Sequence, residues 1–177
     1  MYTKILVALD HSEASRQVFH QALELAQATG AGLMLVHGLS SEEEGSPVPL
    51  PPEVEGNYWM PGSSGEMNFD IWRESWERYE SEGIDRLRHF AAKANEKNVP
   101  TEFRQMVGNP GKVICSMARQ WGADLIVIGH RGRSGLTELM LGSVSSYVMH
   151  RAPCSVLVLK GEILTRPETV KEATATA

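Results

Sequence analysis

Three glycines and a serine near the carboxyl end of the chain have a spacing that can bind a phosphate group. Gly129, Gly132, Gly142 and Ser143 form the pattern G-x2-G-x9-G-S directly after the apolar run "LIVI". Glycine allows a ligand to approach the backbone, and the free N–H groups at a helix start attract negative charge. Hydrogen bonds to a charged group contribute about 1.5–3 kcal/mol each. Several converging amides, with the hydroxyls of Ser143 and Ser145, would therefore hold a phosphate.

The alternative interpretation is that these residues only shape the chain. We expect Gly129 to end a strand and turn the backbone, and Ser143 could be an ordinary helix cap. The spacing is not a P-loop, because "GNPGKV" has too few residues between its glycines, and the dinucleotide fingerprint GxGxxG is absent. Since the whole pattern follows a strongly apolar strand, phosphate binding is the favoured interpretation.

The elements that would position this motif alternate between strands and helices. Short apolar runs predict five strands, at residues 4–9, 32–38, 99–108, 123–129 and 154–160. Helical patterns lie between them, with Asn109 as a candidate N-cap and Pro110 in the first turn of one helix. This alternation predicts an α/β fold, with one parallel sheet covered by helices on both faces. Ligands of such sheets bind beyond the carboxyl ends of the strands, where Asp10 and Gly129 are expected.

One long segment interrupts the alternation. Residues at about 40–68 are rich in Pro and Gly and predict a loop, and the following helix is expected from about Asn68. Tyr58, Trp59, Trp72 and Trp76 lie in or after this loop, where they could form a lid, a partner surface or a small core. The acidic turn "SEEEGS" is expected to be solvated. We predict one domain over residues 1–160 and a flexible tail over 161–177.

The chain resembles the universal stress protein family. The resemblance rests on "VALDHS" after the first strand, on "ADLIVIGHRGRSGLTELMLGSVSSYVMHRAPCSVLVLK", and on the order of elements between them. The family's ATP-binding pattern, G-x2-G-x9-G-[ST], is met completely. The likeness covers residues 2–160 apart from about 40–75. It implies a five-stranded Rossmann-like sheet of order 3-2-1-4-5, a homodimer formed through the fifth strand, and a bound adenine nucleotide.

The resemblance also implies a set of binding residues. Asp10 would face the ribose or contact a phosphate-bound Mg²⁺ indirectly, and the Val36 backbone would meet adenine. The predicted nucleotide-binding residues are Ala8, Asp10, Val36, Gly129, Gly132, Arg133, Gly142, Ser143, Val144 and Ser145. Arg131 and Arg133 flank Gly132 and could both contact phosphate, with solvated loop side chains as the alternative, and Arg133 is favoured because it follows the glycine. His11 and His130 are expected to be loop side chains facing water, with a pH-sensitive phosphate contact as the alternative.

Several functions remain in competition. The favoured one is a stress-response protein that binds ATP, ADP, AMP or a related adenine nucleotide and passes its occupancy to an unknown protein partner. Phosphoryl chemistry needs carboxylates and a group that orients the attacking atom. Asp10 is the one candidate carboxylate, so we expect slow ATP hydrolysis at most. A third hypothesis is a receptor for a signalling nucleotide such as a cyclic dinucleotide.

Composition and charge limit the other classes. The 177 residues carry a net charge of −5, which does not favour nucleic-acid or anionic-membrane binding. No apolar run has the length of a transmembrane helix, and the first residues lead directly into a strand. We therefore expect a cytoplasmic protein. Cys115 and Cys154 form no CxxC pair and are expected to pack as small apolar side chains.

Overall fold

The computed structural model describes residues 1–41, 43, 45–47, 64–130 and 142–160 of the chain. In chain order, the elements are β1 (Lys4–Ala8), α1 (Ala14–Thr29), β2 (Gly32–Leu39), α3 (Ser64–Glu96), β3 (Thr101–Val107), α4 (Pro110–Trp121), β4 (Leu125–His130), α5 (Ser143–Arg151) and β5 (Ser155–Lys160). The predicted alternation of strands and helices is confirmed.

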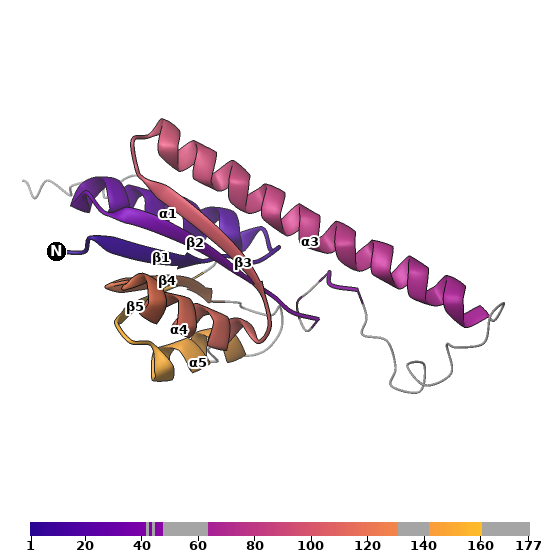
Figure 1. Ribbon diagram of the computed structural model, residues 1–177. Helices are drawn as coiled ribbons and strands as arrows, with labels where there is room; N and C mark the ends of the chain where they lie inside the picture. Colours follow the sequence, from indigo (N-terminus) through magenta and orange to yellow (C-terminus); the bar gives the residue numbers. More distant parts are fainter. Residues whose placement is uncertain (42, 44, 48–63, 131–141, 161–177) are drawn as a thin grey trace, which may run out of the picture.

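The strands form a single sheet in the order β3-β2-β1-β4-β5 (Figure 1). Every pair of neighbouring strands is parallel. This confirms the expected five-stranded parallel sheet and its strand order. β1 lies at the centre, where both faces are covered, and this explains why its sequence is a continuous apolar run rather than an alternating one.

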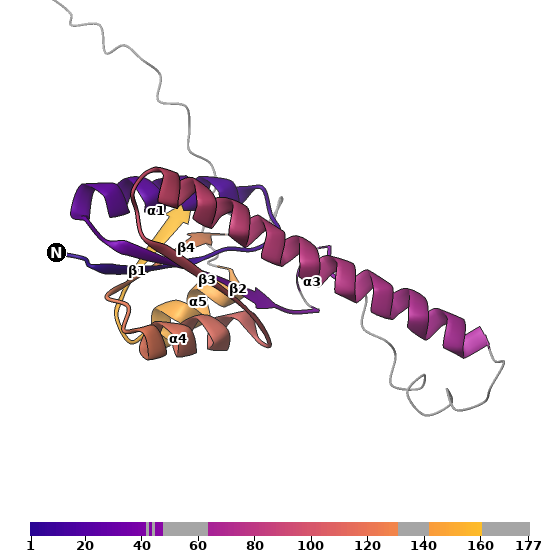
Figure 2. The ribbon, with the colours of Figure 1, turned by 45° about the horizontal axis from the view of Figure 1, so that its top comes forward.

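Helices cover both faces of the sheet (Figures 1 and 2). α1 and α3 pack on one face, where their apolar side chains meet residues such as Ile5, Leu33 and Val127. α4 and α5 pack on the other face, against residues such as Leu6 and Ile126. Successive side chains of a strand point to opposite faces, so each central strand contributes to both cores.

The helix ends follow the local sequence. The Asn109 side chain accepts a hydrogen bond from the Lys112 N–H at 3.1 Å, and Pro110 occupies the first turn of α4. Both predictions for this helix start are confirmed. Gly30 ends α1 and Gly122 ends α4 with φ angles of 73° and 72°, in the left-handed region that glycine adopts without strain.

The long helix α3 differs from the expectation in its start. It begins at Ser64 rather than at about Asn68, and its amino-terminal part extends beyond the sheet (Figures 1 and 2). The apolar stripe that predicts a helix marks only the part packed on the sheet, so it carries no information about the turns beyond it. Within the described residues, no helix has the length and apolar character needed to cross a membrane.

Candidate nucleotide site at the carboxyl edge of the sheet

The carboxyl end of β1 lies between two strands that continue beyond it, β2 to Leu39 and β4 to His130. Ala8 of β1 pairs with Val36 of β2 on one side and with Ile128 of β4 on the other. The Leu9 N–H donates to the Val36 carbonyl at 2.9 Å, which extends this pairing by one residue. Ala8, Val36 and Ile128 therefore lie side by side at the carboxyl end of β1, but Val36 does not end its own strand as expected, because β2 continues to Leu39.

Asp10 follows this edge and is held by the start of α1. Its Oδ1 atom accepts hydrogen bonds from the Ser12 N–H at 2.9 Å, from the Ser12 hydroxyl, and from the Ser15 hydroxyl at 2.7 Å. The Asp10 N–H in turn donates to the Ser15 hydroxyl oxygen at 2.8 Å. These bonds hold the Asp10 carboxylate beside the carboxyl end of β1, and they orient the loop between β1 and α1.

The same loop is held from above by α3. The Arg86 guanidinium donates through Nη1 to the carbonyls of Asp10 and Ser12, both at 3.2 Å. A guanidinium presents several donors in a fixed plane, so it can bridge two carbonyls at once. The conformation around Asp10 thus depends on a residue more than seventy positions away in the chain.

Gly129 has a different local role from the one expected. It lies inside β4, where it pairs with Leu159 of β5, so it neither ends the strand nor turns the chain. A Cβ atom at this position would lie 3.0 Å from a methyl group of Val18 on α1. A side chain at this position would therefore require Val18 of α1 to move by a few tenths of an ångström.

The start of α5 agrees with the expected helix opening. Gly142 is the N-cap in an extended conformation, and the helix begins at Ser143. Among the described residues, no side chain caps this end. The Ser145 hydroxyl is buried and donates to the Gly142 carbonyl at 3.0 Å, whereas Ser143 is exposed. Val144 is half-buried, so the first turn presents backbone N–H groups beside a small apolar surface.

Part of the predicted motif lies outside the described residues. This holds for Gly132 and Arg133, for the neighbouring Arg131, and for Tyr58 and Trp59 of the long loop. Trp72 and Trp76 lie on α3, where their rings stack with centroids 5.8 Å apart.

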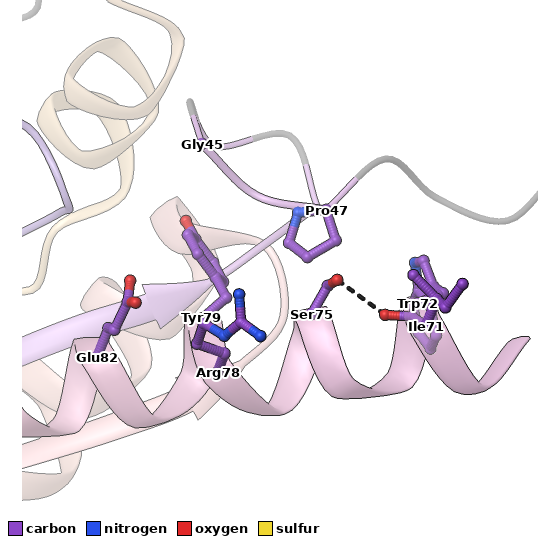
Figure 3. A pocket seen from close by; sticks show the side chains of 8 residues that line it. All are labelled: Gly45, Pro47, Ile71, Trp72, Ser75, Arg78, Tyr79 and Glu82. Atoms are coloured by element: carbon purple, nitrogen blue, oxygen red, sulfur yellow. Dashed lines mark hydrogen bonds between the residues drawn. The ribbon is translucent and has the colours of Figure 1, made fainter. Parts of the chain in front are cut away.

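A pocket of about 480 Å³ lies between α3 and residues 45–47 (Figure 3). Trp72 and Tyr79 contribute to its walls from α3, and Pro47 faces them from the opposite side. None of the described members of the predicted nucleotide set lines this pocket. The pocket is therefore distinct from the described part of the predicted nucleotide site.

Comparison with known proteins identifies the family. The family model for universal stress proteins matches residues 1–160. The universal stress protein Sll1388 of Synechocystis is 37% identical over 159 residues, which cover 90% of this chain and 98% of the relative. The chain belongs to the universal stress protein family. The resemblance drawn from the glycine motif is thereby confirmed.

Solved structures of universal stress proteins share the fold. UspA from Lactobacillus plantarum is 24% identical with a TM-score of 0.68, over 89% of this chain and 97% of that one. An Arabidopsis thaliana family protein with AMP bound is 22% identical with a TM-score of 0.58, over 94% and 97%. A universal stress protein in complex with cAMP is 22% identical with a TM-score of 0.57, over 91% and 98%.

This universal stress protein also contains a buried polar cluster beside the carboxyl edge. The His37 and Glu43 side chains are 3% and 5% exposed, and His37 Nε2 lies 2.8 Å from Glu43 Oε2. The other carboxylate oxygen, Oε1, accepts the His11 N–H at 2.8 Å. The Gln105 Oε1 atom of β3 lies 3.0 Å from His37 Nδ1. One carboxylate therefore joins β2 to the loop that carries Asp10.

The hydrogen bonds define the charge on His37. Gln105 donates through Nε2 to the Glu80 carbonyl at 2.9 Å, so its amide oxygen must face His37. Both ring nitrogens of His37 then face acceptors, and only the doubly protonated imidazolium can donate to both. Burial by itself lowers the pKa of His37, but the hydrogen bond and charge of Glu43 outweigh it and the pKa is raised. Burial raises the pKa of Glu43, but its bonds to His37 bring it below the ordinary value.

His11 does not face water as expected. Its ring stacks on Tyr79 of α3 at 4.3 Å between centroids and lies 4.9 Å from the His37 ring. Burial and the positive charge of His37 lower its pKa, so its ring is neutral beside the charged one. Its Nε2 atom is buried without a hydrogen-bond partner in the described part of the chain.

A glycine brings α3 onto this cluster. A Cβ atom at Gly83 would lie 2.3 Å from Gln105 Oε1, 3.0 Å from His37 Nδ1 and 3.1 Å from His11 Nε2. Two sequence signals could have revealed the cluster, namely a histidine inside the apolar strand "LMLVHGL" and a glycine in the middle of a long helix. The prediction of a solvated acidic turn was wrong for Glu43, because its partner lies on a strand.

The cysteines agree with a packing role. Cys115 is buried, Cys154 is half-buried, and both are free thiols. Burial raises the pKa of each thiol, which reduces its reactivity. The described residues contain no cluster of three His, Cys, Asp or Glu side chains with the geometry of a metal site.

Proposed function

We propose that this protein binds an adenine nucleotide at the carboxyl edge of β1, β2 and β4. The observation that carries the proposal is the level meeting of Ala8, Val36 and Ile128, with the glycine motif continuing from that edge to the start of α5. Family members with known structures have been crystallised with AMP and cAMP, which supports the same ligand class here. Adenine would lie against the Val36 backbone, and Ala8 offers a small side chain beside it.

The phosphates would lie at the start of α5. The N–H groups of Ser143, Val144 and Ser145 belong to the first helical turn, where backbone donors and the helix dipole favour an anion. Gly132 and Arg133 belong to the same motif and are proposed as further phosphate contacts, with the Ser143 hydroxyl beside them. The Ser145 hydroxyl is already bonded to Gly142, so its contribution would come from its backbone.

ATP is the proposed nucleotide, with ADP and AMP as related ligands and Mg²⁺ as an accompanying ion. The Asp10 carboxylate has the charge and chemistry to support Mg²⁺, and the bonds to Ser12 and Ser15 fix its orientation. A carboxylate contact of this kind suits Mg²⁺ that is held chiefly by phosphate oxygens and water. Asp10 would then act through water, as the family resemblance implies.

The proposed role is regulation by nucleotide occupancy in a cytoplasmic stress response, with signal transfer to a protein partner. Calorimetric titration with ATP, ADP and AMP, with and without Mg²⁺, tests the binding. We expect saturable binding of at least one nucleotide by the wild-type protein. Absence of heat and of protection against thermal unfolding with all three would overturn the proposal. A phosphate-release assay on the same samples separates binding from slow hydrolysis.

We also propose that two copies associate through β5. This strand lies at the edge of the sheet, and its Leu157 side chain is 39% exposed. An apolar edge strand with unpaired backbone groups is suited to pairing with another chain. A monomer mass by light scattering at micromolar concentration would contradict this proposal.

A further inference from the structure

The Glu43 carboxylate connects two parts of the molecule that the nucleotide site needs in register. Through Oε2 it is bound to His37, which is fixed in β2 next to Val36. Through Oε1 it accepts the backbone N–H of His11, the residue after Asp10. The part of β2 expected to meet adenine and the loop expected to meet the ribose or metal are thus held by one side chain.

We propose that Glu43, held by His37, is a positioning residue that presets the β1–α1 loop for nucleotide binding. The inference deepens the proposed nucleotide-binding function and rests on it. Glu43 does not touch the ligand in this proposal. It fixes the backbone on which Asp10 stands, so that less ordering remains to be done when the nucleotide binds.

The strength of this link comes from burial. Both side chains are almost inaccessible, so water cannot replace the bond between them, and a charged hydrogen bond in such surroundings is strong. Arg86 of α3 holds the same loop from its other side through the carbonyls of Asp10 and Ser12. The loop is therefore fastened at the His11 N–H by an anion and at the neighbouring carbonyls by a cation.

The link depends on the charge of His37, which gives it a pH dependence. Of the groups around His37, Glu43 lies on the segment after β2, Gln105 on β3, and Asp10 and His11 on the β1–α1 loop. Glu43 and Asp10 favour the charged ring, whereas the neighbouring His11 is neutral. From α3, Tyr79 contacts Glu43, and Glu82 and Arg86 act on His11 with opposite signs.

Loss of one proton from His37 leaves a single N–H donor on a ring whose two nitrogens face the oxygens of Glu43 and Gln105. The ring can then satisfy Glu43 or Gln105, but not both. The link is complete between the lowered pKa of Glu43 and the raised pKa of His37, and it weakens as the pH increases through the pKa of His37. Nucleotide affinity should fall over the same range.

Binding of AMP by the full-length protein tests the inference. Affinity is measured by calorimetry from about pH 6 to about pH 8.5, the range in which a raised histidine titrates. Glu43→Ala removes the link, and Glu43→Gln keeps an acceptor for the His11 N–H but removes the charge. Glu77→Gln is the matched control, because Glu77 is an exposed residue of α3 whose ion pair is with Arg73.

We expect Glu43→Ala to weaken AMP binding about tenfold near pH 6, the factor that loss of one charged hydrogen bond would produce. Glu43→Gln should recover part of this loss, and the advantage of the wild type over Glu43→Gln should shrink as the pH rises. The comparison at each pH cancels the titration of the phosphate itself. Glu77→Gln should follow the wild type throughout.

The outcomes separate the two proposals. If the wild type binds AMP and both Glu43 variants bind it equally well with the same pH profile, the positioning role is refuted while the proposed function stands. If the wild type binds no adenine nucleotide at any pH, the proposed function fails and this inference fails with it. Should Glu43→Ala not fold, Glu43→Gln and the amide NMR signal of His11 still decide, because that signal must shift when Glu43 loses its charge.

Discussion

Removing His37 and removing Glu43 should each lower the free energy of unfolding, and the two losses should depend on pH in opposite directions. His37→Leu leaves a buried carboxylate, and Glu43→Leu leaves a buried imidazole. The penalty for the remaining group cannot exceed the free energy needed to neutralise it, which is about 1.36 kcal/mol for each pH unit away from its ordinary pKa. The ordinary pKa is 4.5 for Glu43 and 6.5 for His37.

These pKa values set an upper limit on the free-energy penalty in each variant. Near pH 7, protonation of the remaining Glu43 in His37→Leu costs up to about 3.4 kcal/mol, whereas the remaining His37 in Glu43→Leu is neutral at almost no cost. Near pH 5 the order reverses, with limits of about 0.7 kcal/mol for Glu43 and about 2 kcal/mol for His37. The direct loss of the pair is common to both variants and cancels in their difference.

The pH dependence of the wild-type stability follows from the pKa shifts of His37 and Glu43. The raised pKa of His37 contributes stability below its ordinary pKa, and this is lost as the pH rises through the folded value. The lowered pKa of Glu43 contributes stability above its ordinary pKa, and this is lost as the pH falls through the folded value. The pair therefore stabilises the fold most between the two ordinary pKa values.

Equilibrium urea unfolding of both variants at about pH 5 and about pH 7 measures the difference. We expect His37→Leu to be the less stable variant at the higher pH, with the difference moving by as much as about 4–5 kcal/mol between the two conditions. A difference that stays constant with pH would show that the remaining Glu43 or His37 keeps its ordinary pKa in each variant, as a solvated group does. That result would refute the reasoning that each remaining group is buried and must lose its charge.

Three further predictions concern other parts of the molecule. Ser143→Asp should weaken ATP binding at least about tenfold, because its negative charge would repel a phosphate at the start of α5, and it should raise the melting temperature slightly through the helix dipole. Ser143→Asn is the neutral control. Equal affinities of the two variants by calorimetry would count against a phosphate at this position. Gly111→Ala should destabilise the fold by about 1–3 kcal/mol in urea unfolding, because its Cβ would lie 2.6 Å from Tyr147 Cδ1, and a cost below about 0.5 kcal/mol would mean that α4 and α5 separate easily. Leu157→Lys should convert a dimer formed through β5 into a monomer by light scattering, and an unchanged dimer mass would place the interface elsewhere.

The sequence by itself determined the fold because its information is local. Continuous apolar runs specify strands that are covered on both faces, and the residues between them specify helices through periodicity and through caps such as Asn109. The glycine motif identified the family without any contact being known. Strand order followed from that family resemblance rather than from the residues alone.

Only the tertiary structure decided which polar residues meet. The sequence predicts a turn at Gly129, but this residue lies inside β4, where a Cβ atom would crowd Val18 of a helix that precedes it by more than one hundred residues. The sequence predicts a solvated Glu43, because its partners, His37 on β2 and the N–H of His11, lie outside the acidic turn. His11, His37 and Gln105 lie on three separate segments and are brought together by parallel pairing and by the approach of α3 at Gly83. Periodicity reports which face of an element is apolar, whereas the charge of a buried group depends on partners that the chain brings close only on folding.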